Sequence, residues 1–445
     1  SKSVSSKGGT QTHNYEFSAT EYEENRHFFL AHFFREHYDQ NMSKLPTVMS
    51  GVTIKRIELW VTNKTGSYES NRNIVAFTDL GEHDHISNPI WSKGNVQVAA
   101  NAANTLYSTM TTQHAAARDI SQTSSDLDAI AGFEGSVDYE KLQSARLLSS
   151  SEYTVNNSLG YVSLNFTLQP DEVLAVAFEY TYNGTTYQVG EFSADLTDNT
   201  QALFVKALKN TSNTPQMGNW DLMMKNVYSL GATTTQKDKF KLDIQYQSDS
   251  AGVYVSYIPE AKYKNTKLLR VMNLDRLDAN NRPNPNGQFD YVEGYTINKG
   301  RIYFPVTEPF GSHLRQYLND EALAEKYCFD ALYDSTKTMA KQIAEKNKFL
   351  LSGEYKGNNG AEISLGAMNV PQGSVTVTAG GVTLTENTDY TVDYSMGVVT
   401  IINQSIIDAG TNVSVDFESN DNYGMQRKTL VGFNLQYDVS KDFTF

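Results

Sequence analysis

The sequence is poor in residues that cross-link or interrupt a chain, with one Cys and 10 Pro among 445 residues. The lone Cys328 cannot form an internal disulfide, and its neighbours Tyr327 and Phe329 predict a buried thiol that packs as a small apolar group. Cysteine usage therefore leaves the cellular compartment open. Long apolar runs are missing too, since no stretch approaches the ~18 residues of a transmembrane helix, although strands of a spanning barrel need no such run.

Positive charge is also scarce, because the sequence has 37 Lys and Arg but 51 Asp and Glu, which gives a formal net charge of -14. Such a chain repels phosphate backbones, so we expect no nucleic-acid partner. A hydrophobic content of 39% and a charged content of 20% indicate globular domains and not a disordered polyelectrolyte. The length exceeds the ~250 to 300 residues of a single hydrophobic core, so we expect two or more domains.

The aromatic content favours pleated sheets, with 27 Tyr and 21 Phe in the chain. We predict an α+β fold that is rich in β structure, with antiparallel sheets, few helices and several modules. The expected divisions are a disordered tail over 1–14, a first α+β module over 15–258, a second over 259–428 and the start of a hairpin over 429–445.

Local patterns predict several individual elements. Ser18 and Glu21 have the spacing of a capping box and predict a helix over about 19–40. From Gly51, VTIKRIELWVTN alternates with one slip near Arg56, which predicts a strand with a bulge. Asn183–Gly184 between two strand patterns predicts a hairpin. Further helices are predicted over 99–110, 139–148, 203–209 and within 320–349, and strands within 240–258.

An internal repeat links two distant segments. EYTVNNSLGYVSLNFTL from Glu152 matches DYTVDYSMGVVTIINQSI from Asp389, and all the matched pairs share one offset. The pairs are Tyr153 with Tyr390, Thr154 with Thr391, Val155 with Val392, Gly160 with Gly397 and Val162 with Val399. A looser match follows, pairing Phe178 with Phe417 and Glu179 with Glu418. We expect two related units, each a strand, a turn with a left-handed glycine and a return strand.

One segment offers closely spaced oxygen ligands. DANNRPNPNGQFDYVEG contains the calcium candidates Asp278, Asn280, Asn284, Asn286 and Asp290, and Gly287 permits a sharp bend. The segment lacks a bidentate Glu at the required offset, and Asn, Pro and Gly clusters are ordinary turn chemistry. We expect no tight calcium site here and no other metal or cofactor.

Motifs for catalysis are not found. His83 and His85 flank Asp84 in LGEHDHISN, but no second His or Cys cluster has useful spacing for zinc, so a solvated loop is expected. The sequence contains no phosphate-binding loop, nucleophile elbow or Cys and His dyad. We expect the chain not to be an enzyme.

Both ends of the sequence indicate a piece of a longer protein. In TLVGFNLQYDVSKDFTF, Val431, Phe433, Leu435 and Tyr437 alternate with polar residues, as in an outer-membrane barrel strand. The polar segment 438–442 reads as a turn, and Phe443 opens a second strand. An edge strand of a soluble sandwich would alternate in the same way.

Blocks spread from Asn25 to Gly432 resemble the SprA family, named Sov in some bacteria. They include NRHFFLAHFFREHY, RIELWVTNK, RNIVAFTDLGE, DEVLAVAFEYT, WDLMMKNVYSLG, LLRVMNLDRLD, GRIYFPVTEPFG and DSTKTMAKQIAEKNKF. The resemblance implies a very large outer-membrane β-barrel translocon of Bacteroidetes, linked to type IX secretion of folded proteins and to gliding motility. It also implies outer-membrane localisation and, as partners, other secretion-system proteins and secreted cargo. No catalytic residues carry over.

Two roles are therefore expected. The first is a non-catalytic portion of this protein-export channel. The alternative is a cell-surface adhesive or carbohydrate-binding module, for which the many Tyr and Trp60, Trp91 and Trp220 would supply sugar-stacking surfaces.

Overall fold

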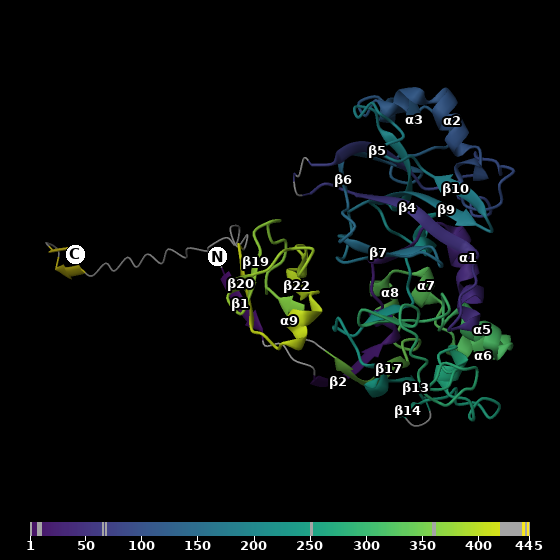
Figure 1. The fold of residues 1–445 in the computed structure, drawn as a ribbon, viewed down its shortest axis with the longest axis vertical. Helices are drawn as coiled ribbons and strands as arrows, with labels where there is room; N and C mark the ends of the chain where they lie inside the picture. Colours follow the sequence, from purple (N-terminus) through teal and green to yellow (C-terminus); the bar gives the residue numbers. More distant parts are fainter. Residues whose placement is uncertain are drawn as a thin grey trace.

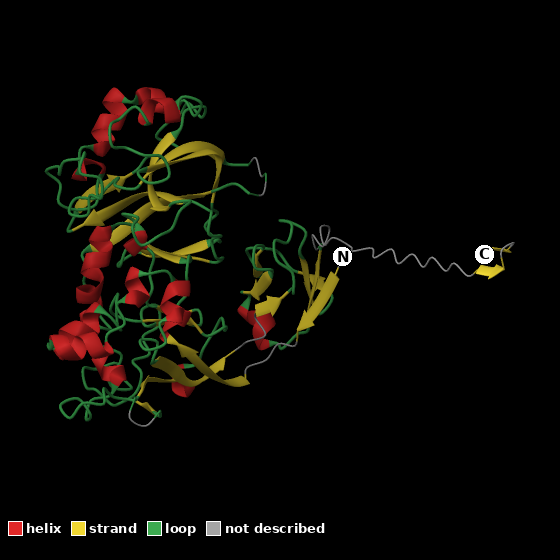
Figure 2. Cartoon of the chain, turned by 180° about the vertical axis from the view of Figure 1, so that it is seen from behind, coloured by secondary structure: helices red, strands yellow, loops and turns green. Residues whose placement is uncertain are grey.

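The computed structural model describes residues 2–6, 11–64, 66, 69–249, 252–357, 362–418, 438–440 and 443–444. The fold is a β-rich α+β arrangement of several antiparallel sheets with few helices, as predicted (Figure 1). Figure 2 shows the strands of the largest sheet at one end and most helices along the outer edge.

The largest sheet closes on itself. Its strands follow the order β10-β9-β11-β5-β6-β4, and β9 also pairs with β4, so five strands form a small closed barrel and β10 extends β9. The bounds are β4 (Val52–Val61), β5 (Asn71–Phe77), β6 (Tyr139–Leu147), β9 (Leu174–Tyr182), β10 (Thr185–Val189) and β11 (Leu203–Lys209). All these pairings are antiparallel except that of β11 with β5, which is parallel. The bulge predicted near Arg56 and the hairpin at Asn183–Gly184 are both confirmed.

Small side chains allow a barrel of only five strands to close. One buried cluster draws on all five strands and fills the barrel, and alanines form a large part of it because a narrow barrel has little interior volume. Its members are Trp60, Ile74, Ala76, Ala145, Ala175, Ala177, Phe192, Leu203, Val205 and Ala207. Short helices lie near one end of the barrel (Figure 1): η3 (Asn101–Ala103), α2 (Leu106–Gln113), η4 (Ala115–Arg118) and α3 (Thr123–Leu127).

A second core is built around a four-stranded sheet in the order β14-β13-β17-β2. Its strands are β2 (Gln11–Ser18), β13 (Lys241–Gln247), β14 (Tyr254–Val255) and β17 (Phe349–Gly357). The surrounding helices are η1 (Ala19–Glu21), α4 (Leu268–Val271), α5 (Ser312–Leu318), α6 (Glu321–Tyr327), α7 (Ala331–Asp334) and α8 (Lys337–Gln342). Cys328 is buried in this core, as expected. Elsewhere the chain forms α1 (His32–Asn41), η2 (Met42–Lys44), η5 (Trp220–Leu222) and η6 (Lys237–Lys239).

A third, smaller core lies beside the other two (Figure 1). Its four-stranded sheet has the order β1-β23-β19-β20, with α9 (Gln404–Asp408) nearby. The strands are β1 (Lys2–Ser6), β19 (Thr376–Ala379), β20 (Val382–Thr383) and β23 (Val413–Phe417). The paired strands β1 and β23 of this sheet are therefore separated by almost the whole chain.

Three further sheets share one design. Each has three strands, in the orders β3-β8-β7, β12-β16-β15 and β18-β22-β21. The bounds are β3 (His27–Phe29), β7 (Tyr153–Asn156), β8 (Tyr161–Leu164), β12 (Val227–Ser229), β15 (Ile297–Asn298), β16 (Arg301–Tyr303), β18 (Glu362–Ser364), β21 (Tyr390–Asp393) and β22 (Val398–Ile401). The predicted repeat is confirmed, because Tyr153 faces Leu164 across β7 and β8 as Tyr390 faces Ile401 across β21 and β22.

The same backbone bond fixes the outer strand of each three-stranded sheet. A leucine that follows that strand donates its N–H to the carbonyl of the turn glycine: Leu30 to Gly160 at 3.0 Å, Leu230 to Gly300 at 2.9 Å and Leu365 to Gly397 at 2.8 Å. All three glycines have positive φ. The described part of the chain thus contains three copies of the unit, one more than the sequence repeat predicted.

Several sequence predictions for local structure are wrong. Residues 2–6 and 11–14, predicted as part of a disordered tail, lie in β1 and β2, because β23 and β17 supply their hydrogen bonds. The helix predicted over 19–40 is interrupted by β3, whose fully buried residues pair with β8, so that α1 begins only at His32. The helices predicted over 139–148 and 203–209 are the strands β6 and β11.

Two other predicted helical regions are shifted or shorter than expected. The helix predicted over 99–110 is η3 followed by α2. Within 320–349 three short helices form, and Asp320 and Thr336 cap two of them by accepting backbone N–H groups. No finding tests the module boundaries at 258 and 428, which stay a prediction.

The pattern predicted as a barrel strand falls mostly outside the described residues, since 419–437 are not described. Beyond them, β24 (Asp438–Ser440) pairs with β25 (Phe443–Thr444). The predicted turn over 438–442 is therefore too long, because its first three residues are in a strand.

Candidate functional site

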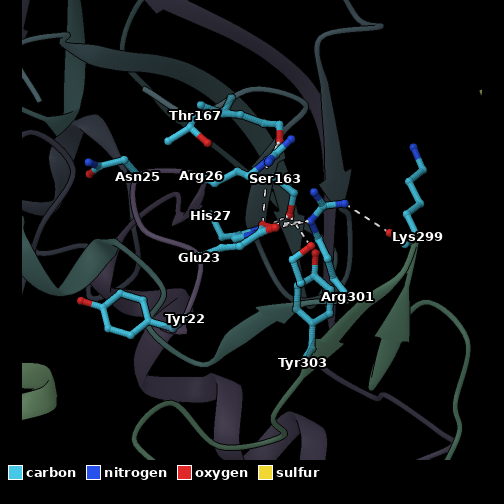
Figure 3. Close-up of polar contacts among 12 residues, drawn as sticks. Tyr22, Glu23, Asn25, Arg26, His27, Ser163, Thr167, Lys299, Arg301 and Tyr303 are labelled. Carbon is cyan, nitrogen blue, oxygen red and sulfur yellow. Dashed lines mark hydrogen bonds and ion pairs between the residues drawn. The ribbon is translucent and has the colours of Figure 1, made fainter. Parts of the chain in front are cut away.

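The candidate site lies where two of the repeated sheets meet. β3 and β8 of the first sheet face β16 of the second, and the segment just before β3 brings in Glu23. These elements place four ionisable side chains together: Glu23, Arg26, His27 and Arg301 (Figure 3). Their side chains are largely covered, with exposed fractions from 0% for His27 to 18% for Arg26.

Glu23 is the centre of this group. Arg301 donates from Nε to both carboxylate oxygens at 2.9 Å, and His27 Nε2 lies 2.7 Å from Oε2. Arg26 Nε is farther away, at 3.8 Å from Oε2. Burial alone would raise the pKa of Glu23, but Arg301, Arg26 and His27 hold it well below its ordinary value. The carboxylate is therefore ionised at neutral pH.

His27 is neutral in this setting. Burial lowers its pKa, and although Glu23 opposes that effect, Arg301 and Arg26 lower the pKa further. A neutral ring has one N–H, which Nε2 donates to the carboxylate, so Nδ1 accepts from Ser163 Oγ at 2.7 Å. Ser163 Oγ in turn lies 3.1 Å from the Tyr303 hydroxyl, which can donate to it. Every proton in this series of hydrogen bonds from Tyr303 to Glu23 then has an acceptor.

The Ser163, His27 and Glu23 array has the connectivity of a hydrolase triad, yet its surroundings differ. Ser163 lies within the paired strand β8 with 8% of its surface exposed, and its oxygen also contacts Tyr303. His27 presents Nδ1 and not Nε2 to the serine. The arrangement suits a fixed polar network that joins two sheets, because both ring nitrogens are already used and the imidazole is fully covered.

The cations open onto a cavity of about 460 Å³ at the junction of the three repeated sheets. Its lining includes Arg26, Lys299, Arg301 and Glu362 among hydroxyl and amide side chains, with isoleucines at one end. Burial and the neighbouring Arg301 lower the pKa of both Arg26 and Lys299, and for Arg26 the nearby carboxylates do not offset this. Burial would lower the pKa of Arg301 as well, but Glu23 raises it above its ordinary value.

The calcium candidates are engaged with the backbone. Asp278 Oδ1 accepts the N–H groups of Asn280 at 2.8 Å and Arg282 at 3.0 Å. The buried Asp290 accepts those of Arg276 at 2.6 Å and Leu277 at 3.0 Å. Burial raises the pKa of Asp290 to about 6, against the effect of these backbone donors. Both carboxylates thus stabilise turns.

The remaining calcium candidates lie on the exposed part of the same loop. Asn280, Asn284 and Asn286 are exposed, and Asn286 Oδ1 accepts the N–H of Gln288 at 2.9 Å. Among the described residues, no group of three His, Cys, Asp or Glu side chains is placed to hold a metal ion. None of the helices in the described part of the chain has the length and apolar character needed to cross a bilayer.

The histidine loop joins a second buried ion pair. His85 stacks on His32 with ring centroids 4.6 Å apart, and His83 contacts Asp84. His32 and Lys206 both contact Glu82, at 3.1 Å and 2.9 Å. Burial would raise the pKa of Glu82, but Lys206 and His32 hold it well below its ordinary value. Glu82 thus ties the loop to the barrel, while Asp84 and His85 are exposed, as predicted for a solvated loop.

The tryptophans do not form a sugar-stacking surface. Trp60, Trp91 and Trp220 are all buried, and Trp220 Nε1 donates to Tyr333 O at 2.7 Å. Of the residues that suggested the adhesive alternative, only tyrosines remain at the surface.

Sequence reasoning missed the network around Glu23, although a signal for it exists. Tyr295, Thr296, Ile297 and Asn298 followed by Gly300 copy the repeat with a turn two residues shorter. SLGA occurs at both 229–232 and 364–367, at the end of the outer strand. This third copy would have predicted that Arg301 lies on a return strand, although not that this strand lies beside Glu23. Searches among family models and curated proteins find no match for this sequence.

Proposed function

We propose that this chain is a non-catalytic structural portion of an outer-membrane protein translocon of the SprA type. The resemblance of the blocks between Asn25 and Gly432 to that family supports the choice of class. The observation that best supports a structural role is the repeated three-stranded unit, present in three copies that meet at one polar junction.

Several of the resembling blocks form this junction. NRHFF contributes Arg26 and His27 of the ionic network, GRIYF contributes Arg301 and Tyr303, and NVYSLG forms β12 with its leucine contact to Gly300. Groups that join sheets in this way fix the relative positions of modules. That property fits a part that shapes a conduit or docks other secretion-system proteins and cargo.

The proposal is tested in the cell that carries the parent gene. A clean deletion should stop export of folded cargo and leave it in the periplasm, and the intact gene in trans should restore export. A second strain with Arg301→Glu in the parent gene should lose export if the junction matters, while Lys264→Glu at an exposed loop should not. Normal export in the deletion strain would end the proposal.

A further inference from the structure

Two cavities adjoin along the edge strand β7. The first, of about 380 Å³, is lined by residues 154–158 of β7 and its turn and by Tyr295 and Asn298 on the opposite side. The second, of about 460 Å³, continues from Thr154 back to Ser150 and reaches β21 and β22. Both cavities are lined by Thr154, and we refer to them together as the β7 groove.

The backbone of β7 has an open edge in this groove. β7 pairs only with β8 among the described strands. The N–H of Asn165 donates to the carbonyl of Glu152, and that of Leu164 donates away from β7 to Arg26. Since bonding alternates along an antiparallel strand, the amides of Tyr153 and Val155 point away from β8. Among the described residues they have no backbone partner.

The groove is positively charged within an acidic chain. The walls of the second cavity carry three cations, Arg26, Lys299 and Arg301, and the carboxylate of Glu362, while Asp393 lies near enough to act on Arg26. Glu23 behind the wall is already bonded to Arg301 and His27. Arg26 uses Nε and Nη2 on the carbonyls of Leu164 and Asn165, which leaves Nη1 available to a ligand.

Lys299 is suited to bind an incoming anion. The residue is exposed to solvent even though partial burial and Arg301 lower the pKa of its amine, and Figure 3 shows its side chain extending away from the cluster around Glu23. Ile401, Ile402 and Ile407 also line the second cavity and give it an apolar surface. The groove thus combines strand-pairing groups, cations and an apolar surface.

We propose that the β7 groove binds an acidic segment of a partner protein in extended conformation. The segment adds as a strand to Tyr153 and Val155, places a carboxylate side chain between Arg26 and Lys299, and rests apolar side chains toward the isoleucines. Backbone pairing supplies affinity and the charged contact supplies selectivity. That the partner belongs to a secretion system rests on the proposed function, whereas the binding chemistry does not.

The first test uses the purified chain and a short, capped, fluorescent peptide in which Glu and Val alternate. Fluorescence anisotropy should show saturable binding that weakens about tenfold when Gln replaces Glu. The same acidic peptide with N-methylated central amides should lose binding, because it cannot pair as a strand. Hydrogen exchange should show new protection of the Tyr153 and Val155 amides.

Variants of the chain test the charges. Lys299→Asn should weaken binding several-fold, since Asn also tolerates the left-handed backbone at this position (φ 46°). Lys264→Asn, at an exposed lysine outside the groove, is the matched control. Glu362→Gln should tighten binding, a result that damage to the fold would not produce.

Three results would overturn the proposal. They are absence of peptide binding, equal binding of the N-methylated peptide, and affinities that neither Lys299→Asn nor Glu362→Gln changes. If glucuronate competed for the groove as well as the peptide did, the groove would be a site for small carboxylates. That result would also overturn the proposal that a peptide adds as a strand. Normal export in the deletion strain would remove the secretion role and leave these binding results unchanged.

Discussion

Replacing Arg301 with alanine removes the cation that β16 places against Glu23. The buried carboxylate loses the Nε donor shared by its two oxygens and keeps His27 at 2.7 Å and Arg26 at 3.8 Å. Removing one partner of a buried ion pair costs about 3–5 kcal/mol. Because the Glu23 side chain retains two partners and 12% exposure, we expect the lower end, about 3 kcal/mol.

A double variant measures the interaction energy between Glu23 and Arg301. Glu23→Gln leaves Arg301 with a neutral amide oxygen in place of the carboxylate and should also destabilise, by about 2–3 kcal/mol. Glu23→Gln combined with Arg301→Ala leaves neither charge of the pair behind. Its cost should therefore fall short of the summed single costs by about 1–2 kcal/mol.

The pH dependence follows from the sign of each shift. Glu23 has a folded-state pKa below its unfolded value of about 4.3, so its stabilisation is present above that pH and is lost as pH falls toward the folded pKa. His27 also has a lowered folded-state pKa, so acidification below its unfolded value of about 6.5 favours the unfolded chain, which takes up the proton first. Without Arg301 the buried carboxylate protonates more readily. The deficit of Arg301→Ala relative to the wild type should therefore be largest at neutral pH and shrink near pH 4.

The assay is urea unfolding followed by tyrosine and tryptophan fluorescence at several pH values. Lys264→Ala, at an exposed lysine, serves as the control. Single costs below about 1 kcal/mol, or single costs that add within about 0.5 kcal/mol in the double variant, would refute the reasoning. A deficit that stays constant between neutral pH and pH 4 would refute the electrostatic part.

Three other predictions concern single residues. Gly160→Ala should lower the melting temperature more than Gly184→Ala, because both have positive φ but only at Gly160 would a new Cβ lie 2.4 Å from Phe34; equal effects would contradict this packing. Cys328, which is 2% exposed and whose pKa burial raises to about 12, should resist a maleimide at pH 8 until urea unfolds the chain. Millimolar calcium should leave the melting temperature unchanged, since Asp278 and Asp290 already bind backbone donors; a rise abolished by Asp278→Ala would show a site.

The sequence predicted elements that local chemistry decides. Asn183–Gly184 can adopt the two positive φ values of its turn, so that hairpin was readable. Gly160 and Gly397 mark the repeated turns for the same reason. The fold class followed from composition, because aromatic and β-branched side chains suit half-buried strands.

Tertiary pairing decided the elements that were mispredicted. Residues 203–209 are buried on both sides between β5 and β9, and such a run has no periodicity to separate strand from helix. Tyr139–Leu147 contains good helix formers, but this segment closes the barrel against β4 and β5. The candidate site joins Glu23 to Arg301 across 278 residues of sequence, a contact that no local pattern contains.

The pairing of β1 and β2 affects folding during synthesis as well as the stability of the folded chain. Both strands are synthesised before the strands they pair with, since β2 pairs with residues 350–357 and β1 with residues 413–417. Until those partners appear, two strand edges at the amino end are unpaired and open to association with other chains. Contacts of such long range make closure slow. A holding chaperone or rapid delivery to the final assembly would shorten this exposed interval, and a chain lacking residues 1–10 should accumulate with the partner edge of β23 uncovered.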